Sequence, residues 1–177
     1  TGAGSGIGRS FALELAKRGG DVICADIDLS STQETVDLIQ SMTSTSAYAV
    51  HCDVGLKESV HALVEQAEQL LGHPVTLLIN NAGVGLGGKF DEVSLEDWQW
   101  CMHVNLWGVI HGCHYFVPKF KQQGFGTIIN VASAAGYTAA PEMTAYNVTK
   151  SSVLALSETL ASELHAYNIA VNVLCPT

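Results

Sequence analysis

Short apolar runs alternate with longer segments of helical periodicity along the whole chain, and this alternation is the strongest constraint on its fold. A continuous apolar run, such as residues 75–79, is typical of a strand buried on both faces of a parallel sheet. Apolar residues at every third or fourth position are typical of helices that cover such a sheet. The pattern therefore predicts an α/β fold with a doubly wound parallel sheet, arranged as one domain over residues 1–177.

The expected elements follow one another in strict alternation. Strands are expected at residues 21–25, 47–52, 75–79, 126–131 and 169–174, and helices at 6–18, 32–42, 56–71, 95–120 and 144–167. Ser94-Leu-Glu-Asp97 resembles a capping box with Asp in place of Glu, and it indicates where the fourth helix begins. In sheets of this kind ligands bind at the carboxyl ends of the strands, so polar residues just after the strands are the candidates for function.

Charge and cysteine content restrict the classes of function. The net charge of −9 argues against nucleic acid and anionic membranes as partners, because both attract basic patches. No apolar run approaches the roughly 20 residues that span a bilayer, and no signal peptide is recognisable. The five cysteines are odd in number and have no Cys-x-x-Cys spacing, which favours a reducing, cytoplasmic setting.

A glycine-rich turn, Thr1-Gly-Ala-Gly-Ser-Gly-Ile-Gly8, leads directly into the first predicted helix. Glycine lets a backbone approach a pyrophosphate closely, and a helix N-terminus supplies N–H groups and a positive dipole end. The spacing matches neither the common Gly-x-Gly-x-x-Gly fingerprint nor the phosphate loop of ATP-binding proteins. The turn still predicts a phosphate site, and a flexible terminus is the alternative. The candidate contacts are Gly2, Ser5, Gly6, Ile7 and Gly8.

Two acidic residues follow predicted strands. Asp26 stands eighteen residues after Gly8, near the offset at which a carboxylate accepts hydrogen bonds from ribose hydroxyls. It would repel a 2′-phosphate, and no Arg or Lys stands at positions 5, 27 or 28, so NAD is favoured over NADP. Asp53 could receive the adenine amino group, with helix capping as the alternative. The neighbours that complete this candidate site are Ile27, Cys52 and Val54.

Tyr146 and Lys150 are one turn apart on one face of a predicted helix. A phenol is a poor base at neutral pH, but an ammonium ion about 4 Å away would stabilise the phenolate by roughly 4 kcal/mol at an effective dielectric near 20. Such a pair suits general acid–base catalysis. Ser133 follows the apolar run 127–132, and its hydroxyl could steady a substrate oxygen opposite the phenol. A surface tyrosine near a solvated lysine is the alternative.

Taken together, these motifs resemble the short-chain dehydrogenase/reductase family. The resemblance implies a Rossmann-like fold and an NAD-dependent oxidoreductase that acts on a small alcohol or ketone. It also implies a homodimer or homotetramer, assembled through the helices at 95–120 and 144–167. The matching residues are Thr1-Gly-x-x-x-Gly-x-Gly8, Asp26, Asp53-Val54, Asn80-Asn-Ala-Gly83, Asn105, Ser133, Tyr146-x-x-x-Lys150 and Pro176.

The same resemblance implies a role for each catalytic position. Tyr146 would be the acid–base, Lys150 would favour its deprotonated form and hold the nicotinamide ribose, and Ser133 would orient the substrate oxygen. Asn105 would support a water that relays protons to Lys150, with a structural polar bridge as the alternative. No metal is required, because the cofactor carries the hydride chemistry. The turn that passes the adenosine ribose would be formed by Asn81, Ala82 and Gly83.

The chain also departs from the family's pattern. The family has a strand before the glycine turn and continues beyond Pro176, so the sequence is interpreted as an internal portion of a longer protein. Unpaired sheet edges would make these 177 residues alone poorly soluble. Three alternatives stay open: an NAD-binding sensor or scaffold without catalysis, an epimerase or dehydratase on the same fold, and a metal site formed by His103, His111 and His114.

Overall fold

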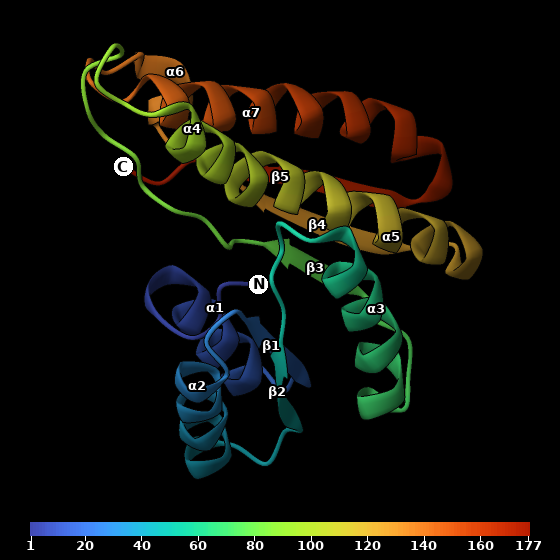
Figure 1. Cartoon of the computed structure of the whole chain (residues 1–177). Helices are drawn as coiled ribbons and strands as arrows, with labels where there is room; N and C mark the ends of the chain where they lie inside the picture. Colours follow the sequence, from blue (N-terminus) through green and yellow to red (C-terminus); the bar gives the residue numbers. More distant parts are fainter. The chain divides into compact units, whose positions relative to one another are not determined.

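Helices and parallel strands alternate through residues 1–177, all of which the computed structural model describes (Figure 1). By their internal contacts the residues form two units, Thr1–Val75 and Thr76–Thr177. Every strand pair is parallel, which confirms the predicted α/β class. Hydrogen bonds group the strands into a two-stranded and a three-stranded sheet, where the sequence had led us to expect one.

The first unit contains the glycine turn and one pair of strands. β1 and β2 run in register from Val22 opposite Ala47 to Asp26 opposite His51. The core between the sheet and the helices includes Cys24 and Ile39, both fully buried. The elements of this unit are α1 (Gly6–Lys17), β1 (Val22–Asp26), α2 (Leu29–Met42), β2 (Ala47–His51) and α3 (Lys57–Leu71).

Helix α2 begins three residues earlier than its periodicity predicts. Asp28 is its N-cap, and the carboxylate accepts hydrogen bonds from the backbone N–H groups of Ser30 and Ser31. A capped start satisfies two of the donors that every helix leaves free at its N-terminus, so the first turn is stable although it carries few apolar residues. The capping role of Asp28 explains the earlier start of α2.

The second unit is a three-stranded sheet with its helices. β4 lies in the middle, with Leu77 of β3 opposite Thr127 and Ile169 of β5 opposite Gly126. β3 starts two residues later than expected, and a short helix, α6, was not predicted. The elements are β3 (Leu77–Asn80), α4 (Leu95–Met102), α5 (Gly108–Gln123), β4 (Gly126–Val131), α6 (Ala135–Thr138), α7 (Thr144–Leu164) and β5 (Ile169–Leu174).

The long helix expected at 95–120 is interrupted by a π-helical turn, His103–Trp107, between α4 and α5. The predicted cap at its start is confirmed, because the Ser94 hydroxyl accepts the Asp97 N–H at 3.0 Å. A π-turn inserts one extra residue into a helix and is often found at functional sites. Here it contains Asn105, whose side chain is fully buried. Gly108, which follows the π-turn, has ordinary helical dihedral angles.

Apolar side chains on one face of the second sheet form the core of this unit. Ile128 of β4 and Val153 of α7 are fully buried, as is Phe120 of α5. α7 lies along β5, and a turn of 3-10 helix at His165–Tyr167 connects the two. This packing fixes the start of α7, which carries Tyr146 and Lys150, relative to the end of β4. None of the helices combines the length and the apolar character that crossing a bilayer requires.

Candidate active site

The glycine turn of the first unit forms an exposed helix start. Gly2 and Gly6 have positive φ angles of 64° and 52°, a backbone region that other residues rarely adopt. Ser5 is the N-cap of α1, but its side chain makes no capping hydrogen bond. Ser5, Gly6 and Ile7 are exposed, so the first N–H groups of α1 are accessible to an anion.

Asp26 lies at the carboxyl end of β1, beside this turn. Its Oδ2 accepts the N–H of Gly4 at 2.9 Å, and its Oδ1 accepts the N–H of Asp28 at 3.1 Å. Each carboxylate oxygen can accept more than one hydrogen bond, so both keep capacity for a hydroxyl donor. A Cβ on Gly4 would lie 3.0 Å from Asp26 Oδ2 and 3.0 Å from the Cβ of Ser31, which leaves room only for glycine.

These features fit a dinucleotide. The turn offers N–H groups at a helix start for a pyrophosphate, and Asp26 offers carboxylate oxygens for ribose hydroxyls. Gly4 keeps the two close together, because any larger residue would push the turn away from Asp26. The carboxylate beside the turn also disfavours a phosphate on the ribose, as the sequence indicated.

The remaining candidates of the first unit surround the carboxyl ends of its strands. Ile27 is exposed, whereas Cys52 and Val54 are buried, and burial raises the pKa of the Cys52 thiol. Asp53 Oδ1 accepts the N–H of Gly55 at 2.9 Å, which makes a local turn. The predicted alternative of helix capping is wrong for Asp53, because α3 begins after Leu56 and has no side-chain cap.

In the second unit, Lys150 is buried beside Tyr146. Its ammonium group donates to the carbonyl of Val131 at 2.9 Å and lies 5.6 Å from the centre of the Tyr146 ring. Burial lowers the pKa of Lys150 to about 8. Only 3% of the residue is exposed, so the alternative of a solvated surface lysine is wrong. Val131 is two residues before Ser133. The bond from Lys150 to Val131 therefore connects α7 to the end of β4.

Asn105 joins the π-turn to the loop after β3. Its Oδ1 accepts the Val84 N–H at 2.7 Å, and its Nδ2 donates to the Val84 carbonyl at 2.8 Å. A Cβ on Gly83 would lie 3.2 Å from Asn105 Oδ1 and 3.5 Å from Lys150 Nζ, so these three residues are brought together. The structural polar bridge, which was the alternative for Asn105, is present. Asn81 and Ala82 precede Gly83 in the same loop.

Ser133 lies just past the end of β4, and its hydroxyl oxygen accepts the N–H of Ala135 at 3.1 Å. Because that contact uses the oxygen as an acceptor, the hydroxyl proton is left to donate to another group. The following N–H, of Ala134, donates to the Pro176 carbonyl at 2.9 Å. Pro176 therefore holds the start of the segment that carries Ser133.

The loop after β3 and the segment between α6 and α7 are joined by a hydrogen bond. The N–H of Gly88 donates to the Glu142 carbonyl at 2.7 Å, and Glu142 has a positive φ of 59°. Asn147 of α7 donates to the Ala140 carbonyl at 2.8 Å, and the hydroxyl of Ser151 donates to the Gly136 carbonyl at 2.8 Å. The segment between Ser133 and Tyr146 is therefore held against α7.

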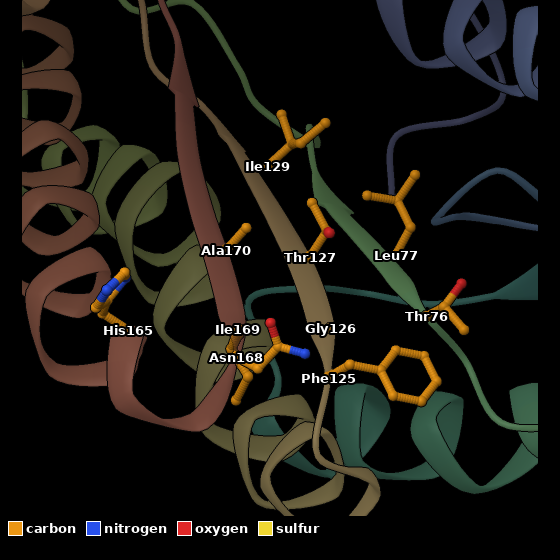
Figure 2. A pocket seen from close by; sticks show the side chains of 10 residues that line it. All are labelled: Thr76, Leu77, Phe125, Gly126, Thr127, Ile129, His165, Asn168, Ile169 and Ala170. Carbon is orange, nitrogen blue, oxygen red and sulfur yellow. The ribbon is translucent and has the colours of Figure 1, made fainter.

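A separate hollow of about 650 Å³ lies at the amino ends of the strands of the second unit, opposite the carboxyl ends where Ser133 is found (Figure 2). It contains no predicted site residue. Figure 2 shows that its side chains come from the amino ends of β3, β4 and β5 and the turns before them, with Ile129 further along β4. In parallel sheets ligands bind at the carboxyl ends, so we do not assign this hollow to the active site. The residues that line it are Thr76, Leu77, Phe125, Gly126, Thr127, Ile129, His165, Asn168, Ile169 and Ala170.

Comparison with known proteins agrees with this geometry. The family model described as short chain dehydrogenase matches residues 1–177. An uncharacterised oxidoreductase of Thermotoga maritima is 38% identical over 176 residues, which are 99% of this chain and 68% of the relative. The chain belongs to the short-chain dehydrogenase/reductase family.

Two further members of the short-chain dehydrogenase/reductase family add detail. A crystal structure of a member from Burkholderia phymatum in complex with NAD has a TM-score of 0.95 and 39% identity. The chain covers 63% of that protein, and 99% of this chain is matched. A cyclohexanol dehydrogenase of an Acinetobacter species is 37% identical over 177 residues, which are 99% of this chain and 70% of the relative.

The sequence did not point to Thr149 as a site residue. In the structure Thr149 is completely buried between Tyr146 and Asn105, two candidate catalytic residues. The Thr149 hydroxyl donates to the Tyr146 carbonyl at 2.7 Å and lies 3.4 Å from Asn105 Nδ2. Its position on the buried face of α7, between Ala145 and Val153, was the available signal. His103, His111 and His114 belong to no group of three or more side chains that could hold a metal ion.

Proposed function

We propose that the protein transfers a hydride between NAD(H) and an alcohol or carbonyl carbon, with residues 1–177 acting as one dinucleotide-binding and catalytic domain. The observation that carries this proposal is the buried Lys150 ammonium, 5.6 Å from the Tyr146 ring and bonded to the carbonyl of Val131. A buried cation beside a phenol is costly for stability, and it is of use where a phenolate must form.

The proposed reaction in the oxidation direction uses the chain's residues for the proton. Tyr146, as phenolate, takes the hydroxyl proton of the substrate, and the positive charge of Lys150 stabilises that phenolate. When bound, NAD supplies the hydride acceptor for oxidation and, as NADH, the donor for reduction. In the reduction direction Tyr146 returns the proton to the substrate oxygen.

Ser133 and Asn105 support this step in different ways. The Ser133 hydroxyl, whose oxygen accepts the Ala135 N–H, donates a hydrogen bond to the substrate oxygen and keeps its proton. Asn105 holds Val84 through two hydrogen bonds and so keeps Gly83 next to Lys150. We also assign to Asn105 the support of a water that exchanges protons with Lys150.

NAD is proposed as the cofactor because Asp26 stands beside the glycine turn and because the Burkholderia phymatum relative was solved with NAD. The cofactor contacts in the first unit are Gly2, Ser5, Gly6, Ile7, Gly8, Asp26, Ile27, Cys52, Asp53 and Val54. Those in the second unit are Asn81, Ala82, Gly83, Tyr146, Lys150 and Pro176. The cyclohexanol dehydrogenase relative supports a small, neutral alcohol or ketone as substrate.

Assembly and location complete the proposal. Trp100 and Trp107 are 47% and 46% exposed along α4 and the π-turn, which supports a homodimer or homotetramer formed through these helices. All five cysteines are unpaired, which supports a reducing, cytoplasmic setting.

The test replaces Tyr146 by Phe in the full-length protein and follows NADH absorbance with a panel of secondary alcohols. We expect turnover to be lost while NADH still binds, because only the phenolic hydroxyl is removed. Tyr167→Phe is the matched control, since this exposed residue lies in the 3-10 turn after α7, where its ring contacts Lys121 of α5. Turnover that survives in Tyr146→Phe would remove Tyr146 from its role.

The same panel separates the other two functions. A sensor or scaffold would bind NADH and turn over no alcohol in the unmodified protein. An epimerase or dehydratase would consume its substrate with no net change in NADH absorbance. No feature of the site favours either of them over hydride transfer.

A further inference from the structure

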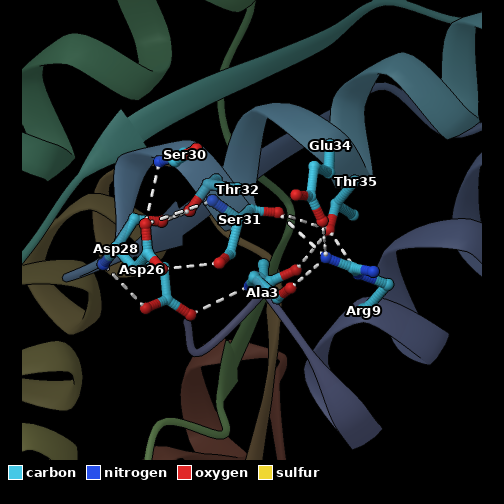
Figure 3. A network of polar contacts seen from close by, with 10 residues as sticks. Ala3, Arg9, Asp26, Asp28, Ser30, Ser31, Thr32, Glu34 and Thr35 are labelled. Atoms are coloured by element: carbon cyan, nitrogen blue, oxygen red, sulfur yellow. Dashed lines mark hydrogen bonds and ion pairs between the residues drawn. The ribbon is translucent and has the colours of Figure 1, made fainter.

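Two side chains of the first unit, those of Arg9 and Thr35, donate hydrogen bonds to carbonyl groups of the glycine turn (Figure 3). The Thr35 hydroxyl donates to the Ala3 carbonyl at 2.8 Å. The Arg9 guanidinium donates to the Gly4 carbonyl through Nη2 and to the Thr35 hydroxyl oxygen through Nε at 2.9 Å. The Ala3 and Gly4 carbonyls therefore both accept hydrogen bonds from side chains of α1 and α2.

Because a peptide is planar, these two contacts also fix the directions of the N–H groups of Gly4 and Ser5. In a trans peptide the C=O and the following N–H point in opposite directions, and the chain has no cis peptide bond. Thr35 holds the Ala3 carbonyl, and the N–H of the same peptide, on Gly4, donates to Asp26 Oδ2 at 2.9 Å. Arg9 holds the Gly4 carbonyl, so the N–H of Ser5 points to the exposed side of the turn.

Without these contacts the turn would be free to rearrange. Gly4 has no Cβ, so rotation of its two neighbouring peptides meets little steric resistance. Thr35 is fully buried, and Arg9 also donates to the Ser31 carbonyl at 3.1 Å, so its guanidinium is fixed at several points. The ion pair of Arg9 with Glu34 adds little, because the Glu34 side chain is 65% exposed.

We propose that Arg9 and Thr35 are positioning residues for the dinucleotide: Arg9 directs the Ser5 N–H toward the pyrophosphate, and Thr35 directs Asp26 toward the ribose. This rests on the proposed NAD-binding function. Neither side chain touches the cofactor in this scheme. They act by fixing which way two peptides of the glycine turn face.

The test measures binding of NADH by fluorescence, with ADP and adenosine as competitors, in the full-length protein and its variants. Arg9→Met should weaken ADP and NADH by about tenfold and leave adenosine within about twofold, since adenosine has no phosphate. Thr35→Val should weaken all three, and Thr35→Ser should restore them because the hydroxyl returns. Glu34→Gln is the matched control and should bind all three ligands like the unmodified protein.

Two sets of outcomes overturn the proposal. Unchanged ADP binding in Arg9→Met, or equal losses of ADP and adenosine in that variant, would reduce Arg9 to a general brace of the fold. A Thr35→Ser variant that fails to restore what Thr35→Val loses would exclude the hydroxyl as the cause. If the unmodified protein binds no NADH, the proposed function itself fails. Normal NADH binding with no effect of Arg9→Met refutes only the positioning role.

Discussion

Both units use hydrogen bonds between side chains and the backbone, but the group that is held in place differs between them. In the first unit the candidate cofactor contacts include backbone N–H groups of the glycine turn, and the side chains of Arg9 and Thr35 donate hydrogen bonds to the Gly4 and Ala3 carbonyls of that turn. In the second unit the side chains are the candidate reactive groups, and the backbone holds them. The Val131 carbonyl binds Lys150, and the Ala135 N–H binds Ser133.

This difference predicts that the candidate residues of the two units tolerate different changes. A backbone donor is removed by no substitution except one to proline, so the first unit depends on residues that control conformation, such as Gly4 and Asp26. The second unit depends on the chemical identity of a few side chains. We therefore expect substitutions in the second unit to reduce the rate of reaction and those in the first to reduce binding or stability.

The largest expected effect is that of Lys150→Met. The Lys150 ammonium lies 5.6 Å from the centre of the Tyr146 ring, and two charges at about that separation interact by about 3 kcal/mol at an effective dielectric near 20, so we expect roughly a hundredfold loss of turnover. The rate of NADH formation at saturating alcohol measures the loss. Lys121→Met is the matched control, because Lys121 lies over the Tyr167 ring away from the candidate site. A Lys150→Met enzyme with the rate of the unmodified protein would contradict the assignment of side-chain chemistry to the second unit.

Asn105→Ala should give the next largest effect, and it is an effect on stability. The substitution leaves the Val84 N–H and carbonyl without their partner, at a cost of about 2 kcal/mol. Thermal unfolding should then occur roughly 4–8 °C lower. Asn172→Ala is the control, since Asn172 is exposed on β5. An unfolding temperature that does not change would mean that the bridge to Val84 contributes nothing.

The candidate residues of the second unit are easier to recognise in the sequence than the contacts that hold the glycine turn of the first unit, and the contrast above explains why. Tyr146, Lys150 and Ser133 are recognisable by residue type, and the alternating pattern predicted where their helix and strand lie. Arg9 and Thr35 donate hydrogen bonds to carbonyl groups that only the folded chain brings near them, and no spacing in the sequence indicates that contact. The glycine turn was recognisable, but the residues that orient it were not.

Element boundaries were missed where local hydrogen bonds, not apolar periodicity, decide them. The early start of α2 depends on the Asp28 cap, and the π-turn depends on the place of Asn105 in the core. Neither feature changes the hydrophobic pattern from which helices are predicted. The grouping of the strands into two sheets likewise reflects hydrogen bonding, which periodicity does not report.

Asp28→Ala tests the conformational role of the first unit with a smaller effect. Loss of this N-cap should lower stability by about 1 kcal/mol and the unfolding temperature by roughly 2–4 °C. Asp28→Asn keeps an oxygen acceptor at the same place and should recover most of the stability. Because α2 carries Thr35, NADH binding should weaken in Asp28→Ala along with stability. A stable Asp28→Ala variant would show that α2 is held by its packing alone.

The smallest effect is expected at the far end of β1, where Asp21 and His73 form an exposed pair. His73 Nε2 lies 3.1 Å from Asp21 Oδ2, and Nδ1 lies 3.2 Å from the Pro74 carbonyl. Both partners are acceptors, so the protonated imidazole, which donates from both nitrogens, can satisfy both contacts, and the pKa of His73 is raised from its usual 6.5, chiefly by Asp21. The pKa of Asp21 is lowered from its usual 3.8, chiefly by the Ser46 N–H and then by His73.

The signs define a pH window for this pair. The contribution of His73 is complete below pH 6.5 and disappears as the pH rises through the raised pKa of the folded state. The contribution of Asp21 is present above pH 3.8 and disappears as the pH falls through its lowered pKa. His73→Gln should therefore unfold at a slightly lower temperature than the unmodified protein at pH 5.5 and at the same temperature at pH 9. NADH binding should be equal in the two proteins at both pH values, because the pair lies at the opposite end of β1 from Asp26. A binding defect in His73→Gln would mean that the glycine turn is controlled from more of the first unit than Arg9, Thr35 and Asp26.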